Sequence, residues 1–149
     1  MVTLRLPSDT NILYPVGLNM QYVTYYLENA AHLFKEYYPE TSQSINLICR
    51  GSSGAILAGI FYMFIPEYNV EIHHVKKPKE KSHSHDIDLL ENGLNVIIDD
   101  FICTGETVNA IYDKLVLDCE RKITIDCLIV QSGFSKHRVN FKPSVLITT

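Results

Sequence analysis

Two patterns of apolar residues divide the chain into predicted helices and strands. Apolar residues recur three or four positions apart where one face of a helix is buried, and they form short continuous runs where a strand lies inside a parallel sheet. The helical spacing predicts helices over residues 21–38, 55–65 and 107–117. Short apolar runs between turn-prone residues predict strands over residues 45–49, 70–75, 94–98, 123–130 and 144–147.

The order of these elements indicates the fold class. Strands alternate with helices, which predicts a three-layer α/β domain with a mostly parallel central sheet and helices on both faces. The chain has 149 residues, no internal repeat and no linker-like stretch, so we expect one domain over residues 1–149. Small ligands bind such sheets at the carboxyl ends of the strands, which directs attention to the loops that follow them.

Composition and charge narrow the class of protein. Hydrophobic residues make up 46% of the chain and charged residues 20%, as in globular proteins. The formal net charge of −4 argues against general nucleic-acid binding through a basic surface. No apolar run is long enough to span a membrane and the first residues lack a signal-peptide stretch, so we expect a cytoplasmic protein without a membrane partner.

The cysteines point to the same compartment. No two of them have CxxC spacing, and each lies in or beside an apolar segment, which favours reduced, buried thiols over a disulfide framework or a zinc site. These residues are Cys49, Cys103, Cys119 and Cys127.

The segment NVIIDDFICTGET at 95–107 combines two kinds of chemistry. An apolar strand runs straight into Asp99 and Asp100, whose carboxylates repel each other and gain little from packing. The turn TGET then precedes a predicted helix, whose unpaired N–H groups and dipole favour an anion such as phosphate. Gly105 permits close approach of the backbone, and the threonine hydroxyls can donate to phosphate oxygens. The carboxylates can accept hydrogen bonds from sugar hydroxyls or hold Mg²⁺ through water, so a phosphorylated sugar meets both needs.

These residues resemble the fingerprint of the type I phosphoribosyltransferases, in which an apolar strand, two acidic residues and a few mostly apolar residues precede TGxT. VIIDDFICTGET matches it throughout, and the resemblance extends with decreasing clarity from about residue 45 to 130. It implies a phosphoribosyltransferase-like fold with a small hood from about residues 1–20 and 132–149. Neither a Walker A loop nor a GxGxxG motif is present, which removes the main rival phosphate-binding motifs.

The resemblance also implies an activity. The phosphoribosyl group would pass from phosphoribosyl pyrophosphate to a nitrogenous heterocyclic base, with release of pyrophosphate and with Mg²⁺ as the cofactor. The partners would therefore be phosphoribosyl pyrophosphate and the base. The assembly is left open, with a homodimer as a candidate.

The same resemblance assigns roles to residues in two segments. Asp99 and Asp100 would contact the ribose hydroxyls directly or through Mg²⁺, and so count as both catalytic and metal-binding. CRGSSGA at 49–55 resembles the pyrophosphate-binding loop of the family, although an ordinary small-residue turn is its alternative interpretation. The residues expected to bind phosphoribosyl pyrophosphate in the two segments are Arg50, Gly51, Ser52, Ser53, Cys103, Thr104, Gly105, Glu106 and Thr107.

The basic stretch at 76–85 lies where the family has a mobile catalytic loop. Lys77, Lys81 and His83 can be laid on the pattern of the orotate phosphoribosyltransferases and are the remaining catalytic candidates. The match is partial, because Pro78 stands where that pattern has a lysine. The alternative is a charged hairpin exposed to solvent.

Two segments bear on the acceptor base. Cys103 stands directly before the Thr–Gly pair, where enzymes for 6-oxopurines usually place an aspartate, and a thiol cannot serve as that carboxylate. This favours an orotate-like pyrimidine over hypoxanthine or guanine. FKPSVLI at 141–147, in contrast, resembles a later base-contacting segment of those same 6-oxopurine enzymes.

Two other functions remain open at this point. The chain could be a non-catalytic sensor or regulator that keeps the phosphoribosyl pyrophosphate pocket. It could also be a metal-binding module, because His73, His74, His83 and His85 flank one predicted hairpin. Adjacent histidines on a strand point to opposite faces, however, and no cysteine joins this cluster.

Overall fold

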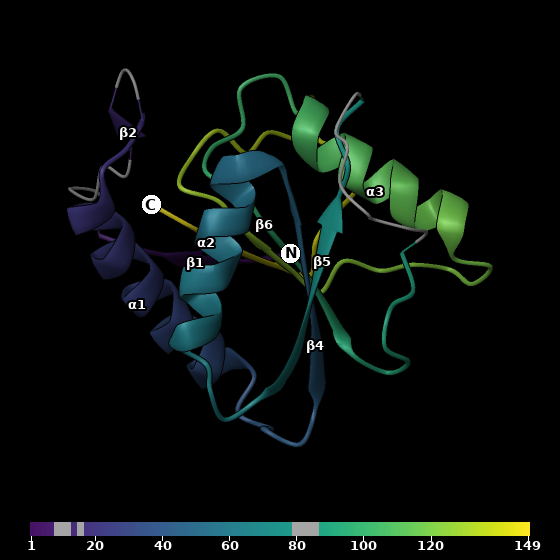
Figure 1. The fold of residues 1–149 in the computed structure, drawn as a ribbon, viewed down its shortest axis with the longest axis horizontal. Coiled ribbons are helices and arrows are strands. Elements are labelled where there is room, and N and C mark those ends of the chain that lie inside the picture. The colour runs from purple at the N-terminus through teal and green to yellow at the C-terminus, as the bar shows by residue number, and fades with distance from the viewer. Residues whose placement is uncertain (8–12, 15–16, 79–86) are drawn as a thin grey trace.

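A computed structural model describes residues 1–7, 13–14, 17–78 and 87–149 (Figure 1). Its central sheet has the order β1-β8-β7-β6-β4-β5, and every pairing in it is parallel. The strands are β1 (Val2–Arg5), β4 (Ser44–Arg50), β5 (Asn69–Val75), β6 (Leu94–Ile98), β7 (Cys127–Ile129) and β8 (Val145–Thr148). The helices are α1 (Met20–Tyr37), α2 (Gly51–Met63) and α3 (Glu106–Asp118), and β2 (Leu13–Tyr14) pairs antiparallel with β3 (Gly17–Leu18).

The helices cover both faces of the sheet. One apolar cluster lies between the sheet and helices α1 and α2, and a second lies between the sheet and α3 (Figure 1). The three-layer α/β architecture predicted from the sequence is therefore confirmed. No helix in the described part of the chain is both long and apolar enough to cross a membrane.

Helix α1 forms where the apolar spacing predicted it. The predicted face, which includes Val23, Leu27 and Phe34, is buried. The Phe34 ring meets that of Phe61 edge-on at 5.8 Å between centroids, which joins α1 to α2. Pro39 follows the end of the helix, as expected.

Helix α2 begins four residues earlier than the pattern predicted. Residues 51–54 were expected to be a loop, but they form the first turn of α2. Gly51 starts this turn with a φ of +76°, a conformation that a side chain would strain. The chain therefore turns from β4 into α2 at Gly51, and Ser52, Ser53 and Gly54 can adopt helical conformation.

The segments expected to form a hood partly belong to the central sheet, and that expectation was wrong for them. Val2–Arg5 pairs in parallel with Val145–Thr148, so both ends of the described chain add strands to one edge of the sheet. In β1 only Leu4 is partly buried, so the alternation that marks a half-buried strand is weak there.

The strand predicted over residues 123–130 is shorter in the structure. Only Cys127–Ile129 is regular, although Ile123 and Ile125 are buried in the strand-like alternation that suggested a longer element. Before Cys127 the Asp126 carboxylate accepts the Asn95 N–H at 2.7 Å. A side chain thus replaces a ladder hydrogen bond at this point.

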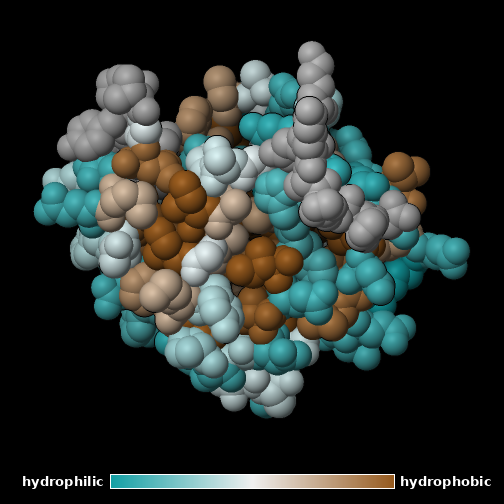
Figure 2. Space-filling model, in the orientation of Figure 1, coloured by the Kyte–Doolittle hydropathy of each residue, from teal (hydrophilic) through white to brown (hydrophobic). Residues whose placement is uncertain are grey.

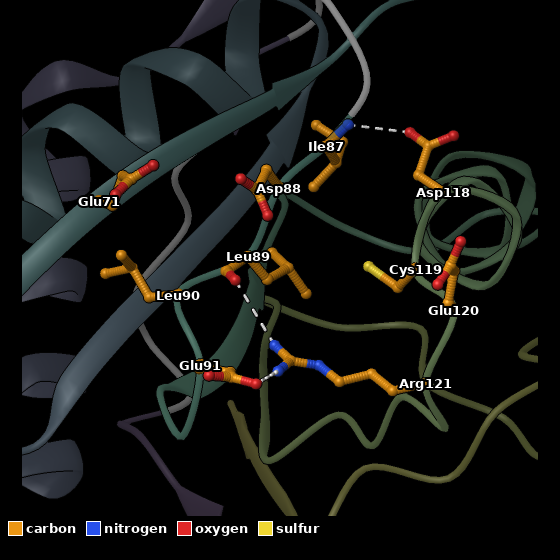
Figure 3. Close-up of a pocket in the computed structure, with 10 residues that line it drawn as sticks. All are labelled: Glu71, Ile87, Asp88, Leu89, Leu90, Glu91, Asp118, Cys119, Glu120 and Arg121. Atoms are coloured by element: carbon orange, nitrogen blue, oxygen red, sulfur yellow. Dashed lines mark hydrogen bonds and ion pairs between the residues drawn. The ribbon is translucent and has the colours of Figure 1, made fainter.

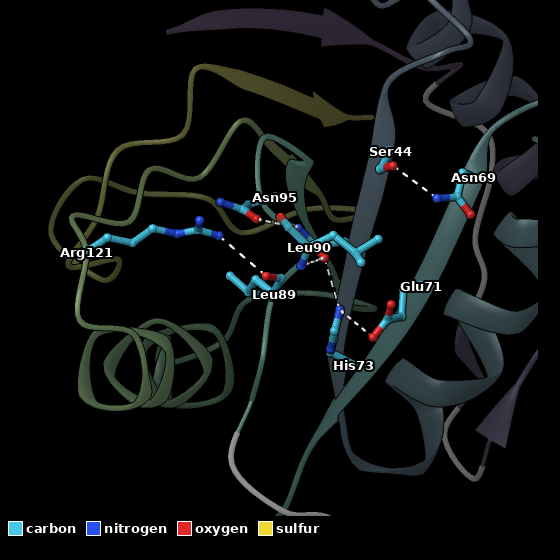
Figure 4. Close-up of polar contacts among 9 residues, drawn as sticks. Ser44, Asn69, Glu71, His73, Leu89, Leu90, Asn95 and Arg121 are labelled. Carbon is cyan, nitrogen blue, oxygen red and sulfur yellow. Dashed lines mark hydrogen bonds and ion pairs between the residues drawn. The ribbon is translucent and has the colours of Figure 1, made fainter.

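A buried polar network ties the amino-terminal parts of β4 and β6 to the preceding turn (Figure 4). The Asn46 amide donates to the Leu90 carbonyl and to Oδ1 of Asn95, both at 3.1 Å, and its Oδ1 accepts the Leu90 N–H at 2.8 Å. Nε2 of His73 lies 3.1 Å from the same Asn46 oxygen. Because these groups satisfy one another, the network fixes how the 87–93 segment enters β6.

The histidines do not converge on a metal in the part of the chain that the structure describes. His73 is buried in the polar network, and His74 is on the other face of β5. His83 and His85 lie outside the described residues. Within the described ranges there is no group of three or more potential metal ligands.

Candidate active site

A polar pocket of about 240 Å³ opens at the carboxyl edge of the sheet. It lies where β4 and β6 end and where α2 and α3 begin, the position at which ligands bind to parallel α/β sheets. Its wall is formed by Arg50, Ser53 and Lys77 together with residues 99–108. The pocket thus combines two adjacent aspartates, a glutamate, two cationic side chains and a helix start.

The two aspartates differ in their surroundings. Asp99 directly follows β6 and is 5% exposed, whereas Asp100 is partly exposed. Burial raises the pKa of the Asp99 carboxyl to about 7, and the neighbouring Asp100 adds to the rise while Lys77 opposes it. Oδ1 of Asp100 accepts the Phe101 N–H at 2.6 Å. Keeping the Asp99 carboxylate ionised in this site therefore costs free energy, and a bound cation would remove that cost.

The loop between the aspartates and α3 is built as an anion cradle. Gly105 caps the amino terminus of α3 with a φ of +89°. Oγ1 of Thr104 accepts the Glu106 N–H at 3.3 Å, so its own proton remains able to donate. Backbone N–H groups at the start of α3 and the hydroxyls of Thr104 and Thr107 favour a bound anion. The Glu106 carboxylate in the first turn would repel that anion if it turned inward.

A segment distant in sequence holds this loop in place, and sequence reasoning missed it. A Cβ on Gly105 would lie 2.1 Å from the Arg138 carbonyl oxygen, so only glycine fits. The side-chain amide of Asn109 donates to the same carbonyl at 2.7 Å and accepts the Asn140 N–H at 2.9 Å. The only sequence signal for this contact was the glycine itself.

A second contact of the same kind supports the middle of the loop. The Ile102 N–H donates to the Ser132 carbonyl at 2.9 Å, and a Cβ on Gly133 would lie 2.0 Å from the Ile102 carbonyl oxygen. The Gln131 N–H donates to the Asp100 carbonyl at 2.8 Å. Residues 131–133 thus position the loop that carries the second aspartate.

Arg50 and Lys77 supply positive charge across the pocket from the aspartates. Arg50 ends β4 and is 9% exposed, and its Nε is buried without a hydrogen-bond partner among the described residues. Lys77 follows β5 and passes over Gly51, where an added Cβ would lie 2.9 Å from Cε of the lysine. A buried, unpaired guanidinium nitrogen in a pocket is a position at which an anionic ligand would supply the missing partner.

The structure brings most of the predicted site residues together, with two kinds of exception. Gly51 and Ser52 do not line the pocket, and Ser52 is exposed on the outward side of α2. Lys81 and His83 lie outside the described residues. Cys103 lines the pocket but is exposed, so the expectation that all four cysteines are buried was wrong for it. The predicted residues that line the pocket are Arg50, Ser53, Lys77, Asp99, Asp100, Cys103, Thr104, Gly105, Glu106 and Thr107.

The donor set fits Mg²⁺. Mg²⁺ is usually held by one or two carboxylates together with substrate phosphates and water, and Asp99 and Asp100 offer two. A cation beside Asp99 would also relieve the raised pKa of its buried carboxyl. These two residues are therefore the ones that would hold the metal.

A larger cavity of about 720 Å³ lies away from this pocket, beside the carboxyl-terminal end of α3 (Figure 3). It is lined by the acidic side chains of Glu71, Asp88 and Glu120, among others, and its Arg121 lies 3.6 Å from Glu91. The Asp118 carboxylate accepts the Ile87 N–H at 2.9 Å. Its negative charge and its distance from the helix starts make it unsuitable for a phosphorylated ligand.

The comparisons with known proteins resolve the fold. No family model matches the chain, and no curated protein matches its sequence. Solved structures do match. The adenine phosphoribosyltransferase of Saccharomyces cerevisiae superposes with a TM-score of 0.64 over 85% of this chain and 78% of its own, at 14% identity. The chain has the phosphoribosyltransferase fold.

Two further structures support the same conclusion. A hypoxanthine-guanine phosphoribosyltransferase from Bacillus anthracis has a TM-score of 0.56 and 14% identity over 85% of this chain and 77% of its own. The purine phosphoribosyltransferase of Pyrococcus horikoshii has a TM-score of 0.52 and 19% identity over the whole of this chain and 89% of its own. The phosphoribosyltransferase fold expected from the sequence is thus confirmed, and the pocket lies at the strand ends where this fold class binds ligands.

Proposed function

We propose that this protein is a phosphoribosyltransferase that moves the phosphoribosyl group from phosphoribosyl pyrophosphate to a nitrogenous heterocyclic base. The observation that carries the proposal is the pocket itself. Two carboxylates follow β6, an anion cradle lies between them and the start of α3, and a buried Arg50 lines the same pocket. The similar structures support the proposal, because those named above are phosphoribosyltransferases.

Each part of the pocket suits one part of this substrate. The 5′-phosphate would sit on the loop 104–107, where helix N–H groups and threonine hydroxyls donate to it. Asp99 and Asp100 would accept hydrogen bonds from the ribose hydroxyls. Arg50 and Lys77 would contact the pyrophosphate, which gives the Arg50 Nε a partner. The yeast neighbour was solved with an imino-sugar bisphosphate and adenine, a ligand pair of the same general chemistry.

The reaction follows from this placement. A ring nitrogen of the base attacks C1′ of the ribose, and the C1′–O bond to pyrophosphate breaks through a transition state with oxocarbenium character. Negative charge grows on the leaving pyrophosphate, where Arg50 and Lys77 would stabilise it most strongly. Bound Mg²⁺ would neutralise part of the same charge. The catalytic roles of Lys81 and His83 remain predictions for residues outside the described ranges.

The similar structures and Cys103 both bear on the choice of acceptor base. The orotate-like preference gains no support from the similar structures, which are named as adenine, hypoxanthine-guanine and purine enzymes. Cys103 is an exposed thiol on the wall of the pocket, where it cannot replace an aspartate. Purines and orotate are therefore tested side by side as acceptor bases.

The test is a screen of bases for pyrophosphate release. The protein, phosphoribosyl pyrophosphate and Mg²⁺ are incubated with adenine, hypoxanthine, guanine or orotate, and nucleotide products are separated by chromatography. We expect one base to give a nucleotide and pyrophosphate in equal amounts. Binding of phosphoribosyl pyrophosphate without any product from a wide set of bases would instead identify a sensor.

A further inference from the structure

A cavity of about 480 Å³ shares no lining residue with the candidate active-site pocket. It is formed by Met1 and by residues of the 134–142 segment, which follows β7. Phe134, Val139 and Phe141 supply its apolar part, and they belong to the cluster between the sheet and α3 or pack against it. Its volume is in the range of sites that bind small molecules. We call it the Phe134 cavity.

The apolar part of the Phe134 cavity suits a planar ring. Phe134 and Phe141 are only partly buried, so both keep ring surface that a ligand can cover. Phe141 stacks on Tyr112, with 5.0 Å between the ring centroids and 28° between the planes, which holds the phenylalanine ring in one orientation. Nucleobases stack on aromatic side chains whatever their sequence of ring substituents, because every base has a π-face.

The polar part of the Phe134 cavity is positively charged. Lys136 and Lys142 line it and are exposed, and its lining contains no carboxylate. No ion pair involves either lysine in the ranges that the structure describes. The carboxylate of Asp113 on α3 is the acidic group that contacts a lining residue, and its Oδ1 accepts the Asn140 side-chain amide at 3.1 Å. In a chain of formal net charge −4, two lysines beside an aromatic surface favour an anionic ligand.

The segment that forms the Phe134 cavity also supports the 104–107 loop of the candidate active site. The Asn109 side chain donates to the Arg138 carbonyl at 2.7 Å and accepts the Asn140 N–H at 2.9 Å. Asn140 lines the cavity, and the Arg138 carbonyl lies directly against Gly105. A ligand that orders the 134–142 segment would therefore also order the 104–107 loop.

We propose that the Phe134 cavity binds a nucleoside monophosphate and thereby strengthens the binding of phosphoribosyl pyrophosphate by the 104–107 loop. The base would stack on Phe134 and Phe141, and the phosphate would contact Lys136 and Lys142. A free base or a sugar phosphate would satisfy only one half of the cavity. The nucleotide site does not depend on the reaction proposed above, whereas its effect on the loop rests on that proposed function.

The first test counts nucleotide sites by calorimetric titration with adenosine monophosphate. The Lys136→Glu, Lys142→Glu double variant should lose one site relative to the parent, with binding there weakened at least about 30-fold, because two attractive charges become repulsive. Lys122→Glu is the control and should keep the parent's count, since Lys122 is exposed outside the cavity. The expected loss is the same whether or not the active-site pocket also binds the nucleotide. An equal count in the parent and the double variant would overturn the proposal.

The second test separates the two halves of the ligand. Adenosine lacks the phosphate, and ribose 5-phosphate lacks the base. Neither should show a site that the parent has and the double variant has lost. If ribose 5-phosphate shows such a site with the affinity of adenosine monophosphate, the cavity binds an anion alone and the assignment to a nucleotide is wrong.

The third test measures the affinity for phosphoribosyl pyrophosphate and Mg²⁺ with and without adenosine monophosphate. The ratio of the two affinities should favour the parent over the double variant by about fivefold or more, and this comparison cancels competition within the active-site pocket. Asn109→Ala should keep the nucleotide site and lose this difference, because its side chain links Arg138 to Asn140. Equal ratios in the parent and the double variant would overturn the effect on the loop. A parent that binds no phosphoribosyl pyrophosphate would refute the proposed function and that effect together, whereas the nucleotide site is decided by the first test.

Discussion

At the scale of single residues, Asp99 lowers the stability of the ligand-free protein. Its carboxyl is buried beside Asp100, and the pKa of that carboxyl is raised to about 7 from an ordinary value near 3.8. Such a cost is often found where a ligand or metal is meant to remove it. The residue is therefore expected to reduce stability and to support binding at once.

The pH dependence of stability follows with a definite sign. Between about pH 4 and pH 7 the unfolded chain has an ionised Asp99 while the folded chain keeps it protonated, so stability falls as the pH rises through this window. Asp99→Asn removes the effect. We expect the free energy of unfolding of the variant to exceed that of the parent by a gap that grows from pH 4 to 7 and then stays constant, at most about 4 kcal/mol. Urea unfolding at several pH values measures it.

The control for this experiment is Asp118→Asn. Burial raises the pKa of the Asp118 carboxyl, but hydrogen bonds from Lys114 and the Ile87 N–H lower it by more, so the net pKa lies below its ordinary value. The carboxyl is therefore ionised in both the folded and the unfolded chain above about pH 5, and the gap of this variant relative to the parent should not grow from there to pH 7. If the Asp99→Asn gap is also flat with pH, the carboxyl is not held protonated and the electrostatic description of the pocket is wrong.

Gly105 gives a second prediction at the residue scale. Gly105→Ala forces a side chain into a left-handed backbone conformation and against the Arg138 carbonyl oxygen, 2.1 Å from the new Cβ. We expect a loss of stability of about 1–3 kcal/mol and weaker ligand binding, because the 104–107 loop must move. Gly17→Ala is the matched control, since a Cβ there meets nothing within 4 Å. Chemical denaturation measures the free energy of unfolding of both variants. Equal stability of Gly105→Ala and Gly17→Ala would contradict the described packing of the 104–107 loop.

At the scale of elements, the buried polar network couples three strands. Asn46 pairs with Leu90, Asn95 and His73, so its loss leaves several buried polar groups without partners. Asn46→Ala should lower the free energy of unfolding by about 2–4 kcal/mol. Asn69→Ala should cost little, because the bond from Asn69 to Ser44 Oγ at 3.0 Å is exposed. Thermal unfolding of both variants tests this, and a tolerated Asn46→Ala would show that the network does not hold the 87–93 segment.

The elements also show what the sequence could and could not predict. Helix α1, strand β6 and the site at the end of β6 were predicted because each depends on a short continuous pattern, as in NVIIDD. The first turn of α2 was missed because GSSG resembles a loop unless the positive φ of Gly51 is known. Strand β1 was missed because its partner, β8, is the last strand of the chain and only Leu4 is partly buried.

The sequence also could not predict which distant residues hold the loop of the site in place. The loop around Gly105 is held by Arg138, and the loop around Ile102 is held by Gly133, each about 30 residues further along the chain. Such contacts leave no periodic pattern. The phosphate loop could therefore be predicted as a motif, but not the segment that fixes its shape.

At the scale of the whole molecule, two kinds of surface lie beside the sheet. Its carboxyl edge carries the pocket, with Arg50, Lys77 and the two aspartates converging from separate elements. The outer side of α2 and the edge at β5 carry exposed apolar side chains (Figure 2), among them Ile56, Met63 and Ile72. Because α2 begins beside Arg50 and also provides the apolar surface, one helix links the two regions.

The most direct test of the central claim is calorimetric titration of the protein with phosphoribosyl pyrophosphate in the presence of Mg²⁺. We predict one site per chain for the parent protein and no measurable binding for the Asp99→Asn, Asp100→Asn double variant. The double variant should remain folded, and Glu120→Gln should bind like the parent, because Glu120 lines the separate acidic cavity. Undiminished binding by the double variant, or no binding by the parent protein, would contradict the assignment of this pocket to a phosphorylated sugar.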